Sequence, residues 1–409
     1  MGQGARDLLP AADAPRLDVC VVGGCGHVGL PLALSFAHAG LDVGIYDISE
    51  VKVAQVAAGR PPFLEQGVEE LLAEALAGGN LAVSCEPPIV SRADVVVLVV
   101  GTPIDEFLNP SLRVFDRVLD DIEPHLADGS LLVLRSTVYP GATDWVASAL
   151  ASRGRSLDVA FCPERIAEGK AVEELVSLPQ IVGGVSEQAA RRAELLFGRL
   201  GVATIRTTAK EAELAKLFTN TWRYLKFAVA NQFFVIAEEA GVDYDRVLHA
   251  VRHDYPRAAD LPGPGFAAGP CLLKDTMQLS AFDGHNFVLG DAARLVNEGL
   301  PEFLVRKLDA ERMLAGHAVA ILGMAFKAES DDTRASLSYK LKRLLWFAGA
   351  KVACTDPYVQ APDIVPLEKA LSDAEVVIVG APHPAYRGLD VGDRRLVDVW
   401  GVVDGKIRP

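Results

Sequence analysis

The stretch Leu17–Gly29, LDVCVVGGCGHVG, decides the fold of this chain. It begins with a β-branched run that predicts a buried strand, and it ends in a glycine-rich turn. The residues that follow, PLALSFAHAG, predict a helix, and the next apolar run, VGIYD, ends at Asp47. A strand, a GxGxxG turn, a helix and an acidic residue about twenty positions further on are typical of a dinucleotide-binding βαβ unit.

The turn Gly24-Cys25-Gly26-His27-Val28-Gly29 has expected roles in holding a cofactor. Gly24 is expected to permit the tight turn, Gly26 to let a pyrophosphate approach the backbone, and Gly29 to let helix and strand pack closely. His27 and Val28 lie where a helix N-terminus offers amide donors to an anion. The alternative is a glycine-rich turn with a purely structural role.

Asp47 indicates which dinucleotide binds. Its carboxylate is expected to accept a hydrogen bond from a ribose hydroxyl and to repel a 2′-phosphate, which favours NAD over NADP. Lys52 either reaches the same ribose or is a solvated lysine. The predicted cofactor is therefore NAD.

Similar signals recur further along the chain. HAVAILGMAF at 317–326 repeats the β-branched run with its glycine, and KVACTD ends at Asp356 as VGIYD ends at Asp47. Other apolar runs alternate with helical patterns and lie at Val95–Val100, Ser130–Leu134, Val159–Cys162, Gln180–Gly183, Glu375–Val379 and Leu396–Val399. Uniformly apolar strands between helices are typical of parallel sheets buried on both faces. We predict an α/β fold with two Rossmann-like parallel-sheet domains.

Residues 209–240 predict one long helix between these domains. They contain no Gly or Pro, their apolar residues recur three and four apart, and Gly241 follows as a C-cap. At 1.5 Å per residue this helix would be about 48 Å long, which suits a spine joining two domains or two subunits. The predicted parts are a loose leader over 1–16, a dinucleotide-binding domain over 17–208, a helical middle domain over 209–314 and a second Rossmann-like domain over 315–409.

The long helix also predicts an assembly. Its large apolar residues lie on more than one face and include Phe218, Trp222, Phe227, Phe233 and Phe234. A helix that is apolar over a wide arc needs more than one covering surface. We therefore expect a homodimer, or a larger homo-oligomer, formed through the middle region.

Composition excludes several classes of partner. The chain has 409 residues with 40 Lys and Arg against 54 Asp and Glu, a net charge of −14, which argues against nucleic acid or an anionic membrane as the main partner. Its six cysteines form no CxxC pair, as expected of a reduced, cytoplasmic protein without a bound metal. No apolar run reaches the roughly 18 residues of a membrane span, and the N-terminus lacks the apolar region of a signal peptide.

Three loops after apolar strands of the first domain hold polar candidates. Gly101-Thr102-Pro103 and Ser136-Thr137-Val138 lie where open parallel sheets bind ligands, although loop capping by Ser and Thr is the better explanation when each loop is taken alone. In the third, Phe161–Gly169, Glu164 and Glu168 stand four apart, so the two carboxylates could share one face. One of them could act as a general base. The alternative for this segment is the start of a surface helix.

Lys216 and Asn220 stand four apart on the long helix and project from one face, with Arg223 one turn further on. A lysine beside an amide offers good donors to an oxyanion or a developing alkoxide. The alternative is a charged stripe on a solvated helix.

The segment Leu261–Asp275, LPGPGFAAGPCLLKD, contains the strongest candidate nucleophile. Cys271 follows a loop rich in Gly and Pro and begins a predicted helix, where a helix N-terminus and the nearby Lys274 would favour a thiolate. Asp275, one turn on, could orient or assist it. The alternative is a buried, inert Cys271, as expected for the other five cysteines.

A charged loop follows the first strand of the second α/β domain. It contains Phe326-Lys327 and Asp331-Asp332-Thr333-Arg334. The lysine and the arginine could contact a phosphate or diphosphate, unless the loop is simply solvated.

Together these motifs resemble the UDP-glucose/GDP-mannose dehydrogenase family, the nucleotide-sugar 6-dehydrogenases. The resemblance extends from Val19 to Val399, with the motifs in the family order. They are GGCGHVGLPLA, VGTP, STVYPG, the PERI…EG segment, the helix with Lys216 and Asn220, GPGF…GPCLLKD, and FK…DDTR.

The resemblance implies a reaction. Family members oxidise the C6 alcohol of a nucleotide sugar to a carboxylate with two NAD turnovers and one thiol, giving uronic acids of the kind used in polysaccharide biosynthesis. Cys271 would add to the C6 aldehyde as a thiohemiacetal that becomes a thioester, while Lys216 and Asn220 hold the C6 oxygen. Glu164 would activate water to hydrolyse the thioester, with Thr137 and Asp275 placing the water or tuning the site.

The resemblance also implies binding residues. Those expected at NAD, beyond the glycine turn, Asp47 and Lys52, are Thr102, Thr137, Glu168, Lys274 and Arg334. Those expected at the nucleotide sugar are Glu164, Arg165, Lys216, Asn220, Arg223, Arg257, Gly265, Phe326 and Lys327. The last two would reach the substrate from the second α/β domain.

Departures from the family pattern bear on the sugar. Ala267-Ala268 stand where members often carry glycines, and Arg223 and the HDYPR segment with Arg257 resemble the branch that acts on UDP-N-acetylhexosamines. The expected substrate is a UDP-N-acetylhexosamine or UDP- or dTDP-glucose. Two alternatives remain: a two-electron NAD-dependent dehydrogenase with a structural Cys271, and a non-catalytic nucleotide-binding sensor on the same fold.

Overall fold

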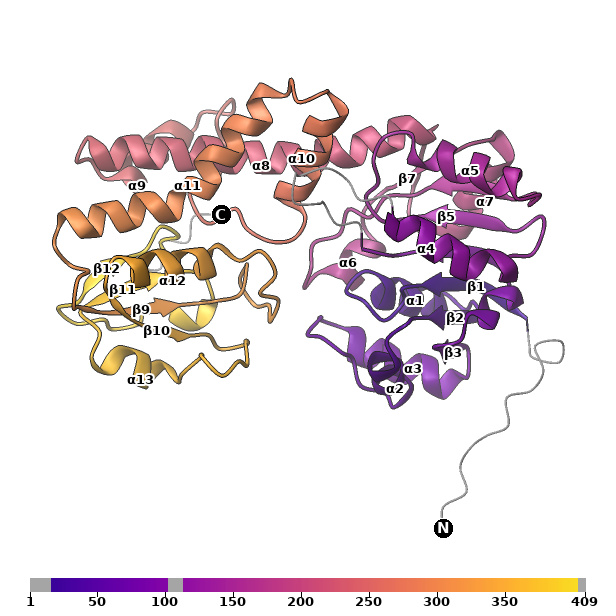
Figure 1. Ribbon diagram of the computed structural model, residues 1–409, viewed down its shortest axis with the longest axis horizontal. Helices are drawn as coiled ribbons and strands as arrows, with labels where there is room; N and C mark the ends of the chain where they lie inside the picture. The colour runs from indigo at the N-terminus through magenta and orange to yellow at the C-terminus, as the bar shows by residue number, and fades with distance from the viewer. Residues whose placement is uncertain (1–15, 102–112, 404–409) are drawn as a thin grey trace, which may run out of the picture. The chain divides into compact units, whose positions relative to one another are not determined.

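The computed structural model describes residues 16–101 and 113–403 (Figure 1). The chain divides into two compact units, Met1–Leu217 and Phe218–Pro409. Within the described ranges, no helix combines the length and apolarity needed to cross a bilayer.

Unit 1 is built on an eight-stranded sheet in the order β3-β2-β1-β4-β5-β6-β7-β8. The strands are β1 (Leu17–Val22), β2 (Val43–Tyr46), β3 (Leu81–Ser84), β4 (Ala93–Leu98), β5 (Leu131–Leu134), β6 (Asp158–Phe161), β7 (Gln180–Gly184) and β8 (Thr204–Thr208). The predicted α/β sheet is confirmed, and its first six strands follow the doubly wound order 3-2-1-4-5-6.

One pairing departs from the parallel arrangement expected from the sequence. Strands β6 and β7 are antiparallel, while β7 and β8 are parallel to each other. The connection between β6 and β7, residues 162–179, contains a single short helix, α6, and does not cross back to the other edge of the sheet. As a result, β7 begins at the edge where β5 and β6 end.

Helices cover both faces of this sheet (Figure 1). One apolar core joins the sheet to α1, α3 and α7, and a second joins the other face to α4 and α5. The helical segments of unit 1 are α1 (Gly29–His38), α2 (Glu50–Ala57), α3 (Val68–Gly78), η1 (Pro87–Arg92), α4 (Arg113–Ile122), η2 (Glu123–His125), α5 (Ala142–Ser152), α6 (Ala171–Leu175) and α7 (Glu187–Gly198). Strands buried on both faces explain why their sequences are apolar without alternation.

The long helix predicted over 209–240 is α8, Ala209–Glu239, which crosses from unit 1 into unit 2. As expected, Gly241 follows the end of the helix: its φ of 69° reverses the chain, and the amide of Val242 donates to the carbonyl of Ala237 at 3.0 Å.

Unit 2 contains a second, four-stranded parallel sheet in the order β10-β9-β11-β12, as predicted. Its strands are β9 (Ala318–Leu322), β10 (Lys351–Thr355), β11 (Val376–Val379) and β12 (Arg395–Val397). Its helical segments after α8 are α9 (Tyr244–Arg252), α10 (Leu272–Phe282), α11 (Val288–Ala310), α12 (Leu337–Phe347), α13 (Leu367–Ser372) and η3 (Pro384–Tyr386). Helices α8, α9, α11 and α12 share one apolar core with this sheet.

Asp356, at the end of β10, anchors the loop that follows β9. Its side chain is fully buried and accepts hydrogen bonds from the amides of Met324 (2.6 Å) and Ala325 (2.9 Å). The ring of buried His383 lies 3.1 Å from the same carboxylate. Its Nδ1 accepts from the amide of Glu329 at 3.1 Å, so Nε2 holds the proton donated to Asp356. Asp356 therefore orders the loop and has no exposed oxygen for a ribose.

Asp356 should make unit 2 acid-sensitive. Burial raises its pKa, but the hydrogen bonds from His383 and from the amides of Ala325 and Tyr358 outweigh burial and lower it from 3.8 to about 2. A depressed folded-state pKa stabilises the fold above pH 4, and that stability is lost as pH falls through 2, a change of about 2 kcal/mol. Denaturant unfolding at pH 5 and pH 2.5 should therefore show a steeper loss for the unaltered protein than for Asp356→Asn. Equal losses would contradict this role.

Candidate active site

The glycine turn after β1 has the shape that a pyrophosphate requires. A Cβ on Gly29 would lie 2.5 Å from the carbonyl oxygen of Gly23, so this position has no room for a side chain. A Cβ on Gly26 would have one neighbour within 4 Å, the same oxygen at 3.7 Å, so a ligand can approach the backbone here. The expectation for Gly24 is corrected: Gly23 takes the left-handed φ of 76°. Gly24 instead needs its small size, because a Cβ there would lie 2.8 Å from the side chain of Ile45.

Asp47 lies at the end of β2, half-buried, beside this turn. One carboxylate oxygen accepts from the amide of Cys25 at 2.9 Å and the other from the amide of Ser49 at 3.0 Å, which leaves acceptor positions for ribose hydroxyls. Helix α1 begins with no acidic side chain in its first turn and no side-chain cap on its N-cap residue Val28. These features fit NAD, with the diphosphate at the helix N-terminus.

Two further predicted cofactor residues lie nearby. The ring of His27 stacks on Phe63 with centroids 4.1 Å apart, and Lys52 lies in the first turn of α2. Thr102 lies outside the described residues.

Replacing Asp47 with alanine should weaken the preference for NAD. The variant loses a charge-assisted hydrogen bond to the ribose, worth about 1.5–3 kcal/mol, so kcat/KM for NAD should fall about 10–100-fold. With no carboxylate to repel a 2′-phosphate, kcat/KM for NADP should rise. Initial rates with both cofactors measure the ratio, and equal rates of the unaltered protein with NAD and NADP would show that Asp47 does not face the ribose.

Glu164 is fixed at the edge where β5 and β6 end. Its Oε1 accepts from the amides of Arg165 (2.6 Å) and Ile166 (2.8 Å), and its Oε2 pairs with the buried guanidinium of Arg135. Arg135 also donates to Gln180 Oε1 at 2.9 Å and to the carbonyl of Cys162 at 3.2 Å. Gln180 reaches this cluster because the antiparallel β7 begins here.

The segment after Glu164 is a loop, so the helix start considered from the sequence is wrong: α6 begins only at Ala171. Glu164 and Glu168 therefore do not share a helix face. The loop is held by buried Glu65, which accepts from the amides of Gly169 (2.7 Å) and Ala171 (2.9 Å). Arg165 turns to the carbonyl of Pro179.

Lys216 is buried in the second turn of α8. Three residues earlier, buried Glu213 accepts from the amide and hydroxyl of Thr143 (2.8 and 2.5 Å) and from the amide of Gly141 (2.6 Å). These bonds fix the start of α8 to the N-terminus of α5, next to the loop that contains half-buried Thr137.

Unit 2 brings four predicted residues together around α10. Asn220 Nδ2 donates to Asp275 Oδ2 at 2.5 Å, and Lys274 Nζ lies 3.1 Å from Asp275 Oδ1. Asp275 is fully buried, and its amide donates to the carbonyl of Cys271, the N-cap of α10, at 2.9 Å. Asn220 lies one turn after Lys216 on the same face of α8, so the continuous helix sets the spacing between the two.

Cys271 differs from the other cysteines in its surroundings. It is exposed, Cys85 is half-buried, and the remaining four are buried. Burial raises the pKa of Cys20, Cys25 and Cys162 to about 12 and that of Cys354 to about 11, so these thiols stay protonated at neutral pH. Cys271 is therefore the best-placed nucleophile among the six.

The loop before Cys271 packs against the loop that contains Phe326. Gly269 has φ of 97°, and a Cβ there would lie 2.6 Å from the ring of Phe326. Earlier in the loop, a Cβ on Gly265 would meet the ring of Trp400 at 2.2 Å, and the backbone of Gly265 is held by Asn231 on α8 (2.8 and 3.0 Å). Predicted nucleophile and predicted sugar-binding residues thus belong to one packed loop pair.

The remaining predicted residues of unit 2 lie on the surface or pair locally. Lys327 Nζ lies over the ring of Phe326 at 5.9 Å, and Arg334 pairs with Asp332 two residues before it. Arg223 is exposed on α8, and exposed Arg257 stacks on Tyr255 at 5.7 Å.

Sequence reasoning did not find several residues that hold the candidate site. They are Glu65, Arg135, Gln180, Glu213, Asn231 and His383. A polar residue within or next to an apolar run could have indicated such residues, because a buried polar group needs a partner. Arg135, directly after the strand LLVL, is an example.

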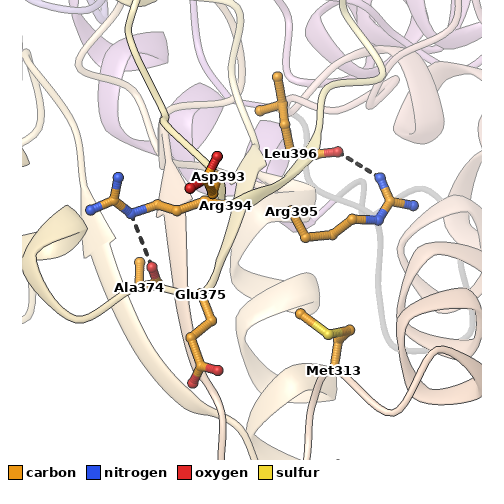
Figure 2. Close-up of a pocket in the computed structure, with 7 residues that line it drawn as sticks. All are labelled: Met313, Ala374, Glu375, Asp393, Arg394, Arg395 and Leu396. Carbon is orange, nitrogen blue, oxygen red and sulfur yellow. Dashed lines mark hydrogen bonds between the residues drawn. The ribbon is translucent and has the colours of Figure 1, made fainter.

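The larger of two cavities described in unit 2, about 850 Å³, lies at the amino ends of β11 and β12 (Figure 2). Figure 2 shows its arginines turned to backbone carbonyls: Arg394 donates to Ala374 O at 3.0 Å and Arg395 to Leu396 O at 2.8 Å. Arg395 also pairs with Glu311 at 2.9 Å. Because these charges are engaged and parallel sheets bind ligands at carboxyl ends, this cavity is not the nucleotide site.

Comparison with known proteins identifies the class. Residues 17–201 match the NAD binding domain of the UDP-glucose/GDP-mannose dehydrogenase family, 210–299 its central domain and 320–405 its UDP binding domain. The chain belongs to this family and is an NAD-dependent nucleotide-sugar dehydrogenase, as the sequence resemblance predicted.

Individual members of the family are similar to this chain over most of its length. The chain is 33% identical over 384 residues to the UDP-N-acetyl-D-mannosamine dehydrogenase of Methanocaldococcus jannaschii, covering 92% of this chain and 88% of the relative. It superposes on the UDP-D-ManNAc dehydrogenase structure from Pyrococcus horikoshii with a TM-score of 0.87 at 30% identity, covering 93% and 94% of the two chains. A UDP-glucose dehydrogenase structure from Pyrobaculum islandicum gives the same TM-score at 31% identity, covering 96% and 95%.

Proposed function

We propose that this protein oxidises the C6 alcohol of a UDP-N-acetylhexosamine to the carboxylate through a thioester on Cys271. The observation that carries the proposal is the setting of Cys271, exposed at the start of α10 beside the buried cluster of Asp275, Asn220 and Lys274. A structural cysteine would be buried, as four of the others are.

The first oxidation needs a group that holds the C6 oxygen as it loses its proton. Lys216 and Asn220 stand one helical turn apart and offer an ammonium and an amide to that oxygen. Bound NAD supplies the oxidising power, one hydride acceptor for each of the two steps. Asp275 fixes the amide of Asn220 by accepting one of its N–H groups.

The second oxidation needs the thiol. The Cys271 thiolate adds to the C6 aldehyde carbon, and the carbonyl oxygen takes up the proton that the alcohol released in the first oxidation, becoming the hydroxyl of a thiohemiacetal. Loss of a hydride from C6 and of the hydroxyl proton gives the thioester. Water then adds to the thioester carbonyl, the C–S bond breaks, and the carboxylate leaves while Cys271 is regenerated.

Glu164 is proposed as the group that orients and deprotonates this water, with Thr137 placing it. The remaining site residues keep the binding roles predicted from the sequence: Glu168, Lys274 and Arg334 toward NAD, and Arg165, Arg223, Arg257, Gly265, Phe326 and Lys327 toward the nucleotide sugar.

The proposed substrate is UDP-N-acetyl-D-mannosamine. Arg223 and Arg257 resemble the N-acetylhexosamine branch, and relatives named for this sugar align over nine-tenths of the chain. NADH release should be measured with UDP-N-acetylmannosamine, UDP-N-acetylglucosamine, UDP-N-acetylgalactosamine, UDP-glucose and GDP-mannose. The highest kcat/KM is expected for the first of these. A preference for UDP-glucose would overturn the sugar assignment and leave the reaction intact.

We also propose a homodimer that covers one face of α8. The exposed residues Phe218, Trp222, Val229, Phe233 and Ile236 fall within an arc of about 60° around the helix. Of the other two phenylalanines predicted on this helix, Phe234 is buried in the core of unit 2 and Phe227 is partly buried, so unit 2 itself covers a second face of α8. Their side chains point away from the exposed arc. We also propose a cytoplasmic location, since none of the six cysteines forms a disulfide.

Light scattering should give about twice the chain mass of 43.6 kDa at micromolar concentration. Phe233→Glu should shift this to a monomer, because an unpaired charge would be buried in the interface. Phe347→Glu is the matched control, since Phe347 is an exposed phenylalanine on α12, outside the proposed face. A monomeric unaltered protein would contradict the dimer.

A further inference from the structure

We propose that Arg135 is a positioning residue for thioester hydrolysis, because it holds Glu164 in the one orientation that leaves a single oxygen lone pair for water. The inference rests on the proposed function, in which Glu164 activates that water.

The guanidinium of Arg135 is held in one position by several contacts. Arg135 is 1% exposed and stands directly after β5. Gln180 and the carbonyl of Cys162 accept from its Nη1, and the guanidinium carbon lies 4.9 Å from the centre of the Phe197 ring. Its Nη2 is left to pair with Glu164. A buried cation this closely surrounded fixes whatever anion it meets.

The carboxylate of Glu164 has one lone-pair position left for a further donor. A carboxylate offers about four lone-pair positions, and three are used here: two on Oε1 by the amides of Arg165 and Ile166, and one on Oε2 by Arg135. The remaining position on Oε2 gives an incoming water one direction of approach. Without Arg135, Oε2 has two open positions, and the carboxylate keeps only the two amide contacts on Oε1, so the position of Oε2 is no longer fixed.

This role predicts a selective kinetic defect. Water enters the reaction only after the second NADH has formed, so misplacing Glu164 leaves both oxidations intact and slows hydrolysis. A general loss of structure would slow the oxidations as well. The thioester on Cys271 should therefore accumulate when Arg135 is changed, as it should when Glu164 itself is changed.

The test compares four variants, each mixed with NAD and UDP-N-acetyl-D-mannosamine. NADH is followed through a burst, and covalent adduct is measured by intact-protein mass spectrometry. Arg135→Met should keep a burst of two NADH per site and then turn over about 10²-fold more slowly, with adduct on the protein. Glu164→Gln should show the same adduct.

Two further variants test whether an adduct in Arg135→Met reflects misfolding or a general effect of losing a buried arginine contact. Arg135→Met leaves a buried carboxylate unpaired, so Gln180→Met provides a second route: it removes an anchor of Arg135 while keeping both charges. It should accumulate adduct, to a smaller extent. Arg192→Met is the matched control, since Arg192 pairs with Asp158 (2.9 Å) at the opposite end of β6, and it should show no adduct.

The outcomes separate the two proposals. Adduct in Glu164→Gln with normal turnover in both Arg135→Met and Gln180→Met overturns the role of Arg135 and leaves the proposed function standing. Absence of adduct in every variant, with steady turnover to the acid, overturns the proposed function itself. Adduct in Arg192→Met as well as in Arg135→Met would show a general defect and would also overturn the positioning role.

Discussion

Cys271→Ser is expected to lower formation of the acid at least about 10³-fold, the scale on which enzymes lose turnover when the nucleophile is removed. A serine hydroxyl is far less nucleophilic than a thiolate, so the aldehyde is not captured efficiently and any ester formed hydrolyses slowly. The first hydride transfer uses Lys216, Asn220 and NAD, so part of it should survive. Rates of NADH release and mass spectrometry of the sugar products measure both steps.

The control for this change is Cys85→Ser. Cys85 is half-buried, follows β3 in unit 1 and has no proposed part in the reaction, so this variant should keep full activity. Because Cys271 is exposed, Cys271→Ser should unfold at the same temperature as the unaltered protein. Full turnover to the acid by Cys271→Ser would establish Cys271 as a structural residue.

Glu164→Gln should trap the covalent intermediate. Loss of a positioned general base costs about 10²–10⁴ in rate, so thioester hydrolysis becomes the slow step and the sugar remains on the protein. Intact-protein mass spectrometry should show this adduct in Glu164→Gln and not in the double variant with Cys271→Ser. An adduct that persists without Cys271 would place the nucleophile elsewhere.

The same substitution should also destabilise unit 1. It leaves the guanidinium of Arg135, which is 1% exposed, without its counter-charge, and removing one partner of a buried ion pair costs about 3–5 kcal/mol. Denaturant unfolding measures this loss, and kinetics should be run well below the melting temperature. Glu173→Gln, an exposed glutamate on α6, is the control expected to leave both stability and turnover unchanged.

The elements of the fold were predictable where one local pattern dominates. The apolar run Leu17–Val22 became β1, and the segment without Gly or Pro over 209–240 became α8 within one residue of its predicted end. The direction of a strand and the buried face of a helix were harder to predict from the sequence, because both depend on packing partners that are distant in sequence. Strand β7 pairs antiparallel with β6, which no pattern within either strand predicts, and Phe234 is buried by packing against Tyr244 and Phe303.

In the candidate site too, residues selected by a local pattern were predictable, and contacts between distant residues were not. Helical spacing and the start of a helix were enough to select Lys216, Asn220 and Cys271 from the sequence. The ion pair of Arg135 with Glu164 joins residues 29 apart, and the hydrogen bond of Asn220 with Asp275 joins residues 55 apart. Such pairs depend on how strands and helices meet, so a pattern within one element cannot reveal them.

The yield of NADH per nucleotide sugar tests the central claim most directly. With limiting UDP-N-acetyl-D-mannosamine and excess NAD, a four-electron oxidation predicts two NADH for each sugar consumed, a uronic acid as the product and no free aldehyde. One NADH per sugar with a stable aldehyde or ketone would contradict it and would make the protein a two-electron dehydrogenase in which Cys271 takes no part.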